Sequence, residues 1–220
     1  MTQTVLRAVI FDMDGVILDS EHLVQQSWRK AAQQMHLTGI DDVYRAQVGT
    51  TRAHASELLR QAFGQDFSTQ DFLTASRTFF YEALGAGGVP PRPFAKEALE
   101  GCRALGLKIG LASSTRQQAV ETELQQAGLL HYFDYALGGD KIANSKPAPD
   151  IYLAACDALH VLPAQAIAVE DSYNGIRSAY NAGMMSVMVP DMLPPTAEMS
   201  RLANAILPNL SYLPAFLQTL

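Results

Sequence analysis

The chain has 220 residues, of which 48% are apolar and 17% charged, and its formal net charge is −6. This length fits one large domain or two small ones, and so many apolar residues can form a packed core, which excludes a disordered protein. The negative total and the lack of a Lys/Arg block argue against nucleic acid and acidic membranes as partners, because both need clustered positive charge.

The first predicted element is a strand followed by a long helical segment. Residues 5–11 form a nearly continuous apolar run that ends at Asp12, which is typical of a strand buried on both faces in a parallel sheet. From about residue 21 to about residue 91 only helical periods occur, so we expect an all-helical insert. A Gly/Pro stretch at 85–93 ends the insert and suits a hinge.

Strands and helices alternate through the rest of the chain. Apolar runs predict strands at 107–112, 135–137, 166–169 and 185–189, and amphipathic periods predict helices near 95–105, 120–127, 151–158 and 176–180. The alternation predicts an α/β fold with a doubly wound parallel sheet. We therefore divide the chain into an α/β core domain at 1–20 and 92–220 and a helical domain at 21–91.

Polar side chains follow the carboxyl ends of the predicted strands, where ligands bind in open α/β sheets. They are Asp12 and Asp14, then Ser113, Ser114 and Thr115, then Lys146 in a loop, and finally Glu170 and Asp171. Carboxylate oxygens with open positions suit Mg²⁺, which also holds water and phosphate oxygens. No His or Cys spacing indicates zinc.

Each of these groups alone also fits an ordinary structural role. The acid pair can form a solvated turn, the hydroxyls at 113–115 can cap the next helix, and Lys146 can be a solvated loop lysine. Ser172 and Asn174 are predicted to be caps of a later helix. Convergence of acids, hydroxyls and one lysine at several strand ends favours a single site instead.

Four segments together resemble the haloacid dehalogenase superfamily of phosphohydrolases, and within it the group around β-phosphoglucomutase and sugar-phosphate phosphatases. They are residues 11–21, 111–114, 145–150 and 169–175, in the family's order. The resemblance runs the whole length of the chain and identifies the helical insert as the family's cap domain. It implies a Mg²⁺-dependent phosphatase of small phosphorylated metabolites, with sugar phosphates as the expected class.

The resemblance also implies the catalytic roles. Asp12 would be the nucleophile that forms an aspartyl-phosphate, and Asp14 would protonate the leaving alcohol and then activate water. Lys146 would help to neutralise the phosphoryl charge, and the Ser113 hydroxyl and the Ser114 N–H would hold phosphoryl oxygens. The implied ligands of Mg²⁺ are Asp12, Asp14 through its backbone carbonyl, Glu170 and Asp171.

The cap is expected to select the substrate. By resemblance, Arg52 matches the arginine that grips the second phosphate in β-phosphoglucomutase, and Arg77 matches a cap lysine; both can equally be exposed surface arginines. The mutases carry a histidine where this chain has Val24, and a valine cannot act as a base. This difference favours a phosphatase, although His22 nearby keeps a mutase-like phosphotransferase open as the alternative.

The remaining expectations concern other classes and location. A non-catalytic phosphoaccepting receiver-like module is a remote alternative, because receiver domains are smaller and lack a helical insert.

No apolar run approaches the roughly 20 residues that cross a bilayer, and no basic leader precedes one, so we expect a cytoplasmic protein. Cys102 and Cys156 are too few for a disulfide framework and are predicted to be buried thiols. The oligomeric state stays open, a monomer included.

Overall fold

The computed structural model describes residues 5–48, 52–85 and 87–220, without the side chains of residues 52 and 53. Its strands are β1 (Ala8–Phe11), β2 (Lys108–Ser113), β3 (Tyr135–Gly138), β4 (Ala166–Glu170), β5 (Met185–Met188) and β6 (Ala205–Ile206). They form one sheet of order β3-β2-β1-β4-β5-β6, in which every pairing is parallel. The predicted α/β fold with a parallel sheet is confirmed.

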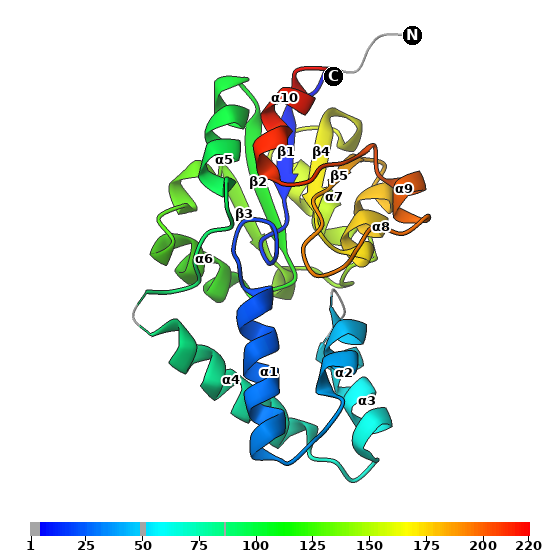
Figure 1. Ribbon diagram of the computed structural model, residues 1–220. Helices are drawn as coiled ribbons and strands as arrows, with labels where there is room; N and C mark the ends of the chain where they lie inside the picture. Colours follow the sequence, from blue (N-terminus) through cyan, green and yellow to red (C-terminus); the bar gives the residue numbers. More distant parts are fainter. Residues whose placement is uncertain (1–4, 49–51, 86) are drawn as a thin grey trace.

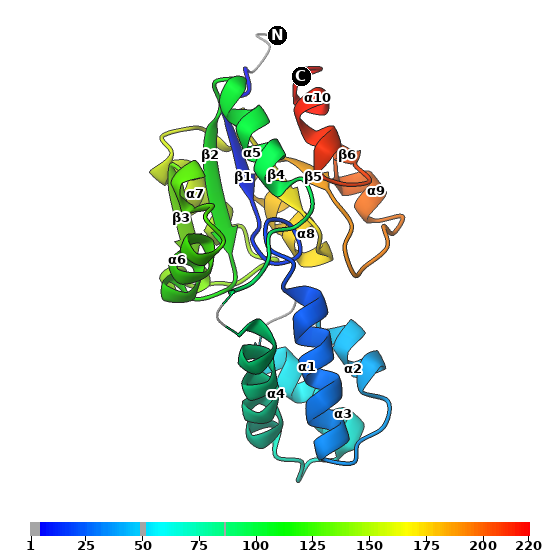
Figure 2. The same cartoon turned by 60° about the vertical axis from the view of Figure 1, so that its left-hand side comes forward.

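Helices cover both faces of this sheet (Figures 1 and 2). They are α5 (Ala95–Ala104), α6 (Gln117–Gln126), α7 (Asp150–Ala158), α8 (Tyr173–Asn181), α9 (Met199–Leu202) and α10 (Leu213–Leu217). Successive residues of a strand point to opposite faces. Val9 and Phe11 therefore pack with residues of α5, α6 and α10, whereas Ala8 and Ile10 pack with residues of α7 and α8.

The segment between β1 and α5 is helical, as predicted, and extends from the carboxyl edge of the sheet (Figure 2). It comprises α1 (Glu21–Gln34), α2 (Ile40–Gln47), α3 (Arg52–Phe63) and α4 (Thr69–Leu84). This segment has a core of its own, in which Trp28 packs edge-to-face on Tyr44 and Phe72, with ring centroids 5.4 and 5.2 Å away. The domain boundaries given above stay a prediction.

The structure differs from the sequence expectation at several strand ends. Ser113 pairs with Gly138 and Glu170 pairs with Met188, so these two polar residues end β2 and β4 rather than following them. Strand β6 is not predicted from the sequence, because a strand of two half-buried residues has no long apolar run. Cys102 and Cys156 are buried and free, as predicted. Across the described part of the chain, no helix combines the length and apolarity that crossing a bilayer requires.

Candidate active site

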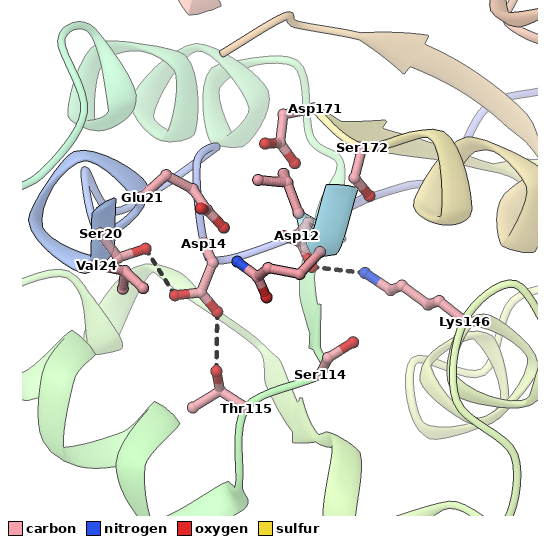
Figure 3. Close-up of a pocket in the computed structure, with 12 residues that line it drawn as sticks. Asp12, Asp14, Ser20, Glu21, Val24, Ser114, Thr115, Lys146, Asp171 and Ser172 are labelled. Atoms are coloured by element: carbon pink, nitrogen blue, oxygen red, sulfur yellow. Dashed lines mark hydrogen bonds and ion pairs between the residues drawn. The ribbon is translucent and has the colours of Figure 1, made fainter. Parts of the chain in front are cut away.

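The carboxyl ends of β1, β2 and β4 meet at one edge of the sheet. Because β1 lies between the other two, Phe11 pairs with Leu111 on one side and Val169 on the other. This register places Asp12 between the ends of its neighbouring strands. A pocket with a cavity volume of about 250 Å³ opens there, between the sheet and helices α1 and α2 (Figure 3).

Most of the predicted core residues meet at this pocket. Those that line it are Asp12, Asp14, Ser114, Lys146 and Asp171. Ser113 and Glu170 are fully buried and contact residues of the lining. The structure therefore brings the acids, the hydroxyls and the lysine of separate strand ends into one place.

Lys146 connects two of the buried carboxylates. Its Nζ donates hydrogen bonds to Asp12 Oδ1 at 2.5 Å, to Glu170 Oε1 at 2.6 Å and to the carbonyl of Ala112 at 2.9 Å. Burial alone would lower the pKa of Lys146, but the charges of Asp12 and Glu170 raise it above its usual value. Lys146 is therefore a fixed positive charge beside Asp12, and its interpretation as a solvated loop lysine is wrong.

Glu170 is held beneath the pocket by several partners. Its Oε1 accepts from the hydroxyl of Tyr152 at 2.7 Å as well as from Lys146, and its Oε2 accepts from the hydroxyl of Ser172 at 3.2 Å. A Cβ atom at Gly175 would lie 1.9 Å from Glu170 Cδ. Glycine is therefore required there for α8 to begin against this carboxylate.

Unlike Asp12 and Glu170, the carboxylate of Asp171 has no positively charged partner among the described residues. It is buried, and none of the described residues donates a hydrogen bond to it. Burial first, and then the neighbouring charges of Asp12 and Glu170, raise its pKa well above the usual range. Burial also raises the pKa of Asp12, to about 8. The positive charge of Lys146 lowers this pKa but does not cancel the effect of burial, and the charges of Glu170 and Asp14 raise it further.

This arrangement fits a bound cation. Oxygen atoms of Asp12, Glu170 and Asp171 lie within 4.8 Å of one another, and all three side chains are buried. One lysine cannot neutralise three carboxylates, and hard oxygen donors of this kind suit Mg²⁺. The residues present could therefore hold a divalent metal ion.

Asp14 lies outside this cluster and is held by hydroxyl groups. Ser20 donates to Oδ1 at 2.7 Å and Thr115 donates to Oδ2 at 2.9 Å (Figure 3). Ser113 also donates to Oδ2, at 3.3 Å. Ser20 stands at the N-cap position of α1 but makes no side-chain cap there, because its hydroxyl is turned toward Asp14. The Asp14 carboxylate is thus tied to both the core and the start of the cap.

The helix-cap interpretation of residues 113–115 is wrong. Arg116 stands at the N-cap position of α6, and the first helical N–H, that of Gln117, donates to Asp140 at 2.7 Å. A carboxylate from the next strand's loop fills the capping role, which leaves the hydroxyls of Ser113 and Thr115 for Asp14.

The two predicted caps of α8 differ in outcome. Ser172 is confirmed as its N-cap, since its hydroxyl accepts the N–H of Gly175 at 3.1 Å. The same prediction for Asn174 is wrong: it lies inside the first turn, and its side chain accepts from Arg177 at 3.2 Å.

Of the two arginines predicted to bind substrate from the cap, the structure places the side chain of only Arg77, and it lies away from the pocket. Arg52 begins α3, but its side chain lies outside the described residues. Arg77 lines a separate groove of about 280 Å³ with Trp28 and Phe80, between α1 and α4. Val24 borders both hollows. Roles for the two arginines in binding substrate stay predictions.

His22, which had kept the phosphotransferase alternative open, does not line the pocket. Its side chain is 54% exposed, and its Nε2 lies 3.9 Å from Asp191 Oδ1. Val24 does line the pocket, so the position where the mutases carry a histidine faces the site with an apolar side chain.

Some polar residues that line the pocket, among them Ser20, Glu21 and Gln47, have no role assigned from the sequence. Glu21 is the last residue of the first of the four segments that carry the resemblance. Glu21 lines the pocket, and burial raises its pKa to about 7, although a hydrogen bond from Tyr44 acts in the opposite direction. The sequence feature that points to Glu21 is its position as the first residue of the helical insert, directly after the loop that carries Asp12 and Asp14.

Comparisons with known proteins give a consistent picture. A family model of haloacid dehalogenase-like hydrolases matches residues 6–183. A phosphorylated carbohydrates phosphatase of Thermotoga maritima is 32% identical over 183 residues, which cover 81% of this chain and 82% of that protein. Hexitol phosphatase B of Escherichia coli is 31% identical over 191 residues, or 83% of each chain. Among solved structures, beta-phosphoglucomutase from Clostridium difficile matches with a TM-score of 0.75 and 25% identity, covering 94% of this chain and 93% of that one.

Proposed function

The chain belongs to the haloacid dehalogenase-like hydrolase family, and on that basis we propose that it is a Mg²⁺-dependent phosphatase of small phosphorylated metabolites, sugar phosphates first among them. The observation that carries the proposal is the contact of Lys146 with Asp12 in a pocket that Asp14 and Asp171 also line. Two relatives named as phosphatases of phosphorylated carbohydrates and hexitols support the substrate class.

The first half of the proposed reaction transfers the phosphoryl group to the protein. A carboxylate oxygen of Asp12 attacks phosphorus, and the bond from phosphorus to the ester oxygen breaks. Asp14, protonated for this step, gives its proton to the leaving alcohol. Lys146 offsets the charge that gathers around the phosphoryl oxygens, and Ser113 and Ser114 orient them.

The second half returns the protein to its starting state. Asp14, now a carboxylate, takes a proton from a water molecule whose oxygen attacks phosphorus. The bond between phosphorus and Asp12 breaks, and inorganic phosphate leaves. The separation of Asp14 from the carboxylate cluster supports this role, because its side chain contacts Ser20 and Thr115 and can exchange a proton with a substrate group in the pocket.

Mg²⁺, when bound, supplies the positive charge that lets an anionic phosphate approach several carboxylates. Asp12, Glu170 and Asp171 would hold it, together with the backbone carbonyl of Asp14. The lack of a hydrogen-bond donor to Asp171 among the described residues supports this assignment.

A mutase-like phosphotransferase is the second candidate, because a beta-phosphoglucomutase is among the structural matches. Incubation with β-glucose 1-phosphate and a bisphosphate primer distinguishes the two. Glucose 6-phosphate would indicate phosphotransfer, whereas inorganic phosphate alone would support hydrolysis.

The proposed function is tested by measuring phosphate released from a panel of sugar and polyol phosphates. Release should require Mg²⁺ and stop when a chelator removes it. A well-folded preparation that releases no phosphate from any ester in the presence of Mg²⁺ would refute the proposal.

A further inference from the structure

The cap side of the pocket carries a carboxylate that the proposed reaction does not use. Glu21, the first residue of α1, lines the pocket beside Asp12 and Asp14 (Figure 3). We propose that Glu21 recognises hydroxyl groups on the leaving-group side of the substrate, and so selects phosphate esters of neutral polyhydroxylated alcohols. This inference rests on the proposed function and deepens it.

The position of Glu21 is fixed by a partner on another helix. The hydroxyl of Tyr44 in α2 lies within hydrogen-bond distance of Glu21 Oε2 and of its backbone carbonyl oxygen, the latter at 2.9 Å. Tyr44 is fully buried and packs edge-to-face on Trp28. A glutamate held in this way loses little conformational entropy when it binds a ligand, which favours a recognition role.

One oxygen of Glu21 is left for a ligand. Tyr44 approaches Oε2, and none of the described residues donates a hydrogen bond to Oε1. A carboxylate oxygen accepts hydrogen bonds only from donors, and the hydroxyls of a sugar or polyol are donors of suitable size. The hydrogen bond to a charged acceptor is among the stronger ones.

The other cap residues around the pocket fit the same kind of ligand. Among the described residues, the cap contributes Glu21, Val24, Gln47 and Val48 to the lining, and none of these is a cation. The valines suit the carbon-bound hydrogens of a sugar or polyol, and the amide of Gln47 can donate to or accept from a hydroxyl. A second phosphate beside the ionised carboxylate of Glu21 would meet like charge, whereas a neutral hydroxylated group would not.

The test compares esters that differ in hydroxyl content. Glucose 6-phosphate and glucitol 6-phosphate carry several hydroxyls, and phenyl phosphate carries none on its leaving group. For Glu21→Ala we expect kcat/KM to fall at least about tenfold on the two hydroxylated esters, mainly through KM, and less than about threefold on phenyl phosphate. Glu21→Gln, which keeps an acceptor but loses the charge, should lie between wild type and Glu21→Ala. Glu57→Gln, an exposed acid on α3, is the matched control and should change neither class.

Tyr44→Phe provides an independent variant that leaves Glu21 in place without its anchor. It should raise KM for the hydroxylated esters by about threefold to tenfold and leave phenyl phosphate nearly unchanged. If Glu21→Ala does not fold, Tyr44→Phe still tests the inference. A ratio of KM values between the two ester classes that is the same in Tyr44→Phe as in wild type would then overturn it.

Two other results overturn it directly. One is an equal loss on both ester classes, which would assign Glu21 a structural or general role. The other is a wild-type enzyme that prefers phenyl phosphate to both hydroxylated esters. Absence of phosphate release from every ester is a different outcome, because it refutes the proposed function itself and this inference with it.

Discussion

Lys146 donates a hydrogen bond of 2.5 Å to Asp12 from 134 positions away in the sequence, and both residues are buried. The same ammonium group reaches Glu170 at 2.6 Å. One cation therefore compensates two carboxylates, and its removal would leave both without a positively charged partner among the described residues.

Lys146→Met should therefore be costly in both stability and activity. Breaking a buried ion pair from one side typically costs about 3–5 kcal/mol, because a charge is left uncompensated. We expect a loss of that size in urea unfolding without Mg²⁺, and a fall in phosphate release of at least about hundredfold. Adding Glu170→Gln should restore part of the stability and none of the activity. Lys96→Met, on the exposed surface of α5, is the control, and an unfolding midpoint for Lys146→Met that matches this control would contradict the interpretation.

Tyr152 donates a hydrogen bond to Glu170, the carboxylate that Lys146 also contacts. Burial, with the charge of Glu170, raises its pKa well above the usual value, so its hydroxyl stays a donor to Glu170 at 2.7 Å. Tyr152→Phe removes only this donor and should lower the free energy of unfolding by about 1–3 kcal/mol. Phosphate release should fall about threefold to thirtyfold as Lys146 and Glu170 lose their fixed positions. Tyr180→Phe, an exposed tyrosine on α8, should change neither quantity, and the same result for Tyr152→Phe would show that the hydroxyl is dispensable.

The raised pKa of Glu21 predicts a pH dependence of stability. Its folded pKa of about 7 lies above the unfolded value of 4.5, chiefly through burial. The folded state therefore binds the proton more tightly, and stability falls as pH rises from about 4.5 to about 7. Glu21→Gln removes this contribution, so its urea midpoint should decline less than that of wild type between pH 5 and pH 8. Parallel declines in the two proteins would show that Glu21 does not titrate in this range.

Much of the fold and the core of the site followed from local patterns in the sequence. Apolar runs located the strands, and parallel strands must bring their carboxyl ends to one edge, so the proximity of Asp12 and Glu170 was predictable. Lys146 stands in a loop, and only its place in the family's motif indicated that it would join them. The sheet order needed pairing information that the sequence pattern does not contain.

The parts that were missed depend on contacts between distant residues. A helical period does not indicate which oxygen the hydroxyls of Tyr44 and Tyr152 reach. Helix capping by Ser113 and Thr115 is the locally reasonable alternative to a site role, and it does not occur because Asp140, on a different loop, caps α6. Such competition between a local and a distant partner is decided only by the folded chain.

Phosphate release by Asp12→Asn, measured beside wild type with Mg²⁺ and a sugar phosphate, tests most directly whether Asp12 is the nucleophile. Asparagine keeps the shape of the side chain but is a far weaker nucleophile. We expect the variant to keep a cooperative urea transition at or above the wild-type midpoint, since burial disfavours the charge of Asp12, and phosphate release to fall at least about ten-thousandfold. Release by folded Asp12→Asn at the wild-type rate would show that Asp12 is not the nucleophile.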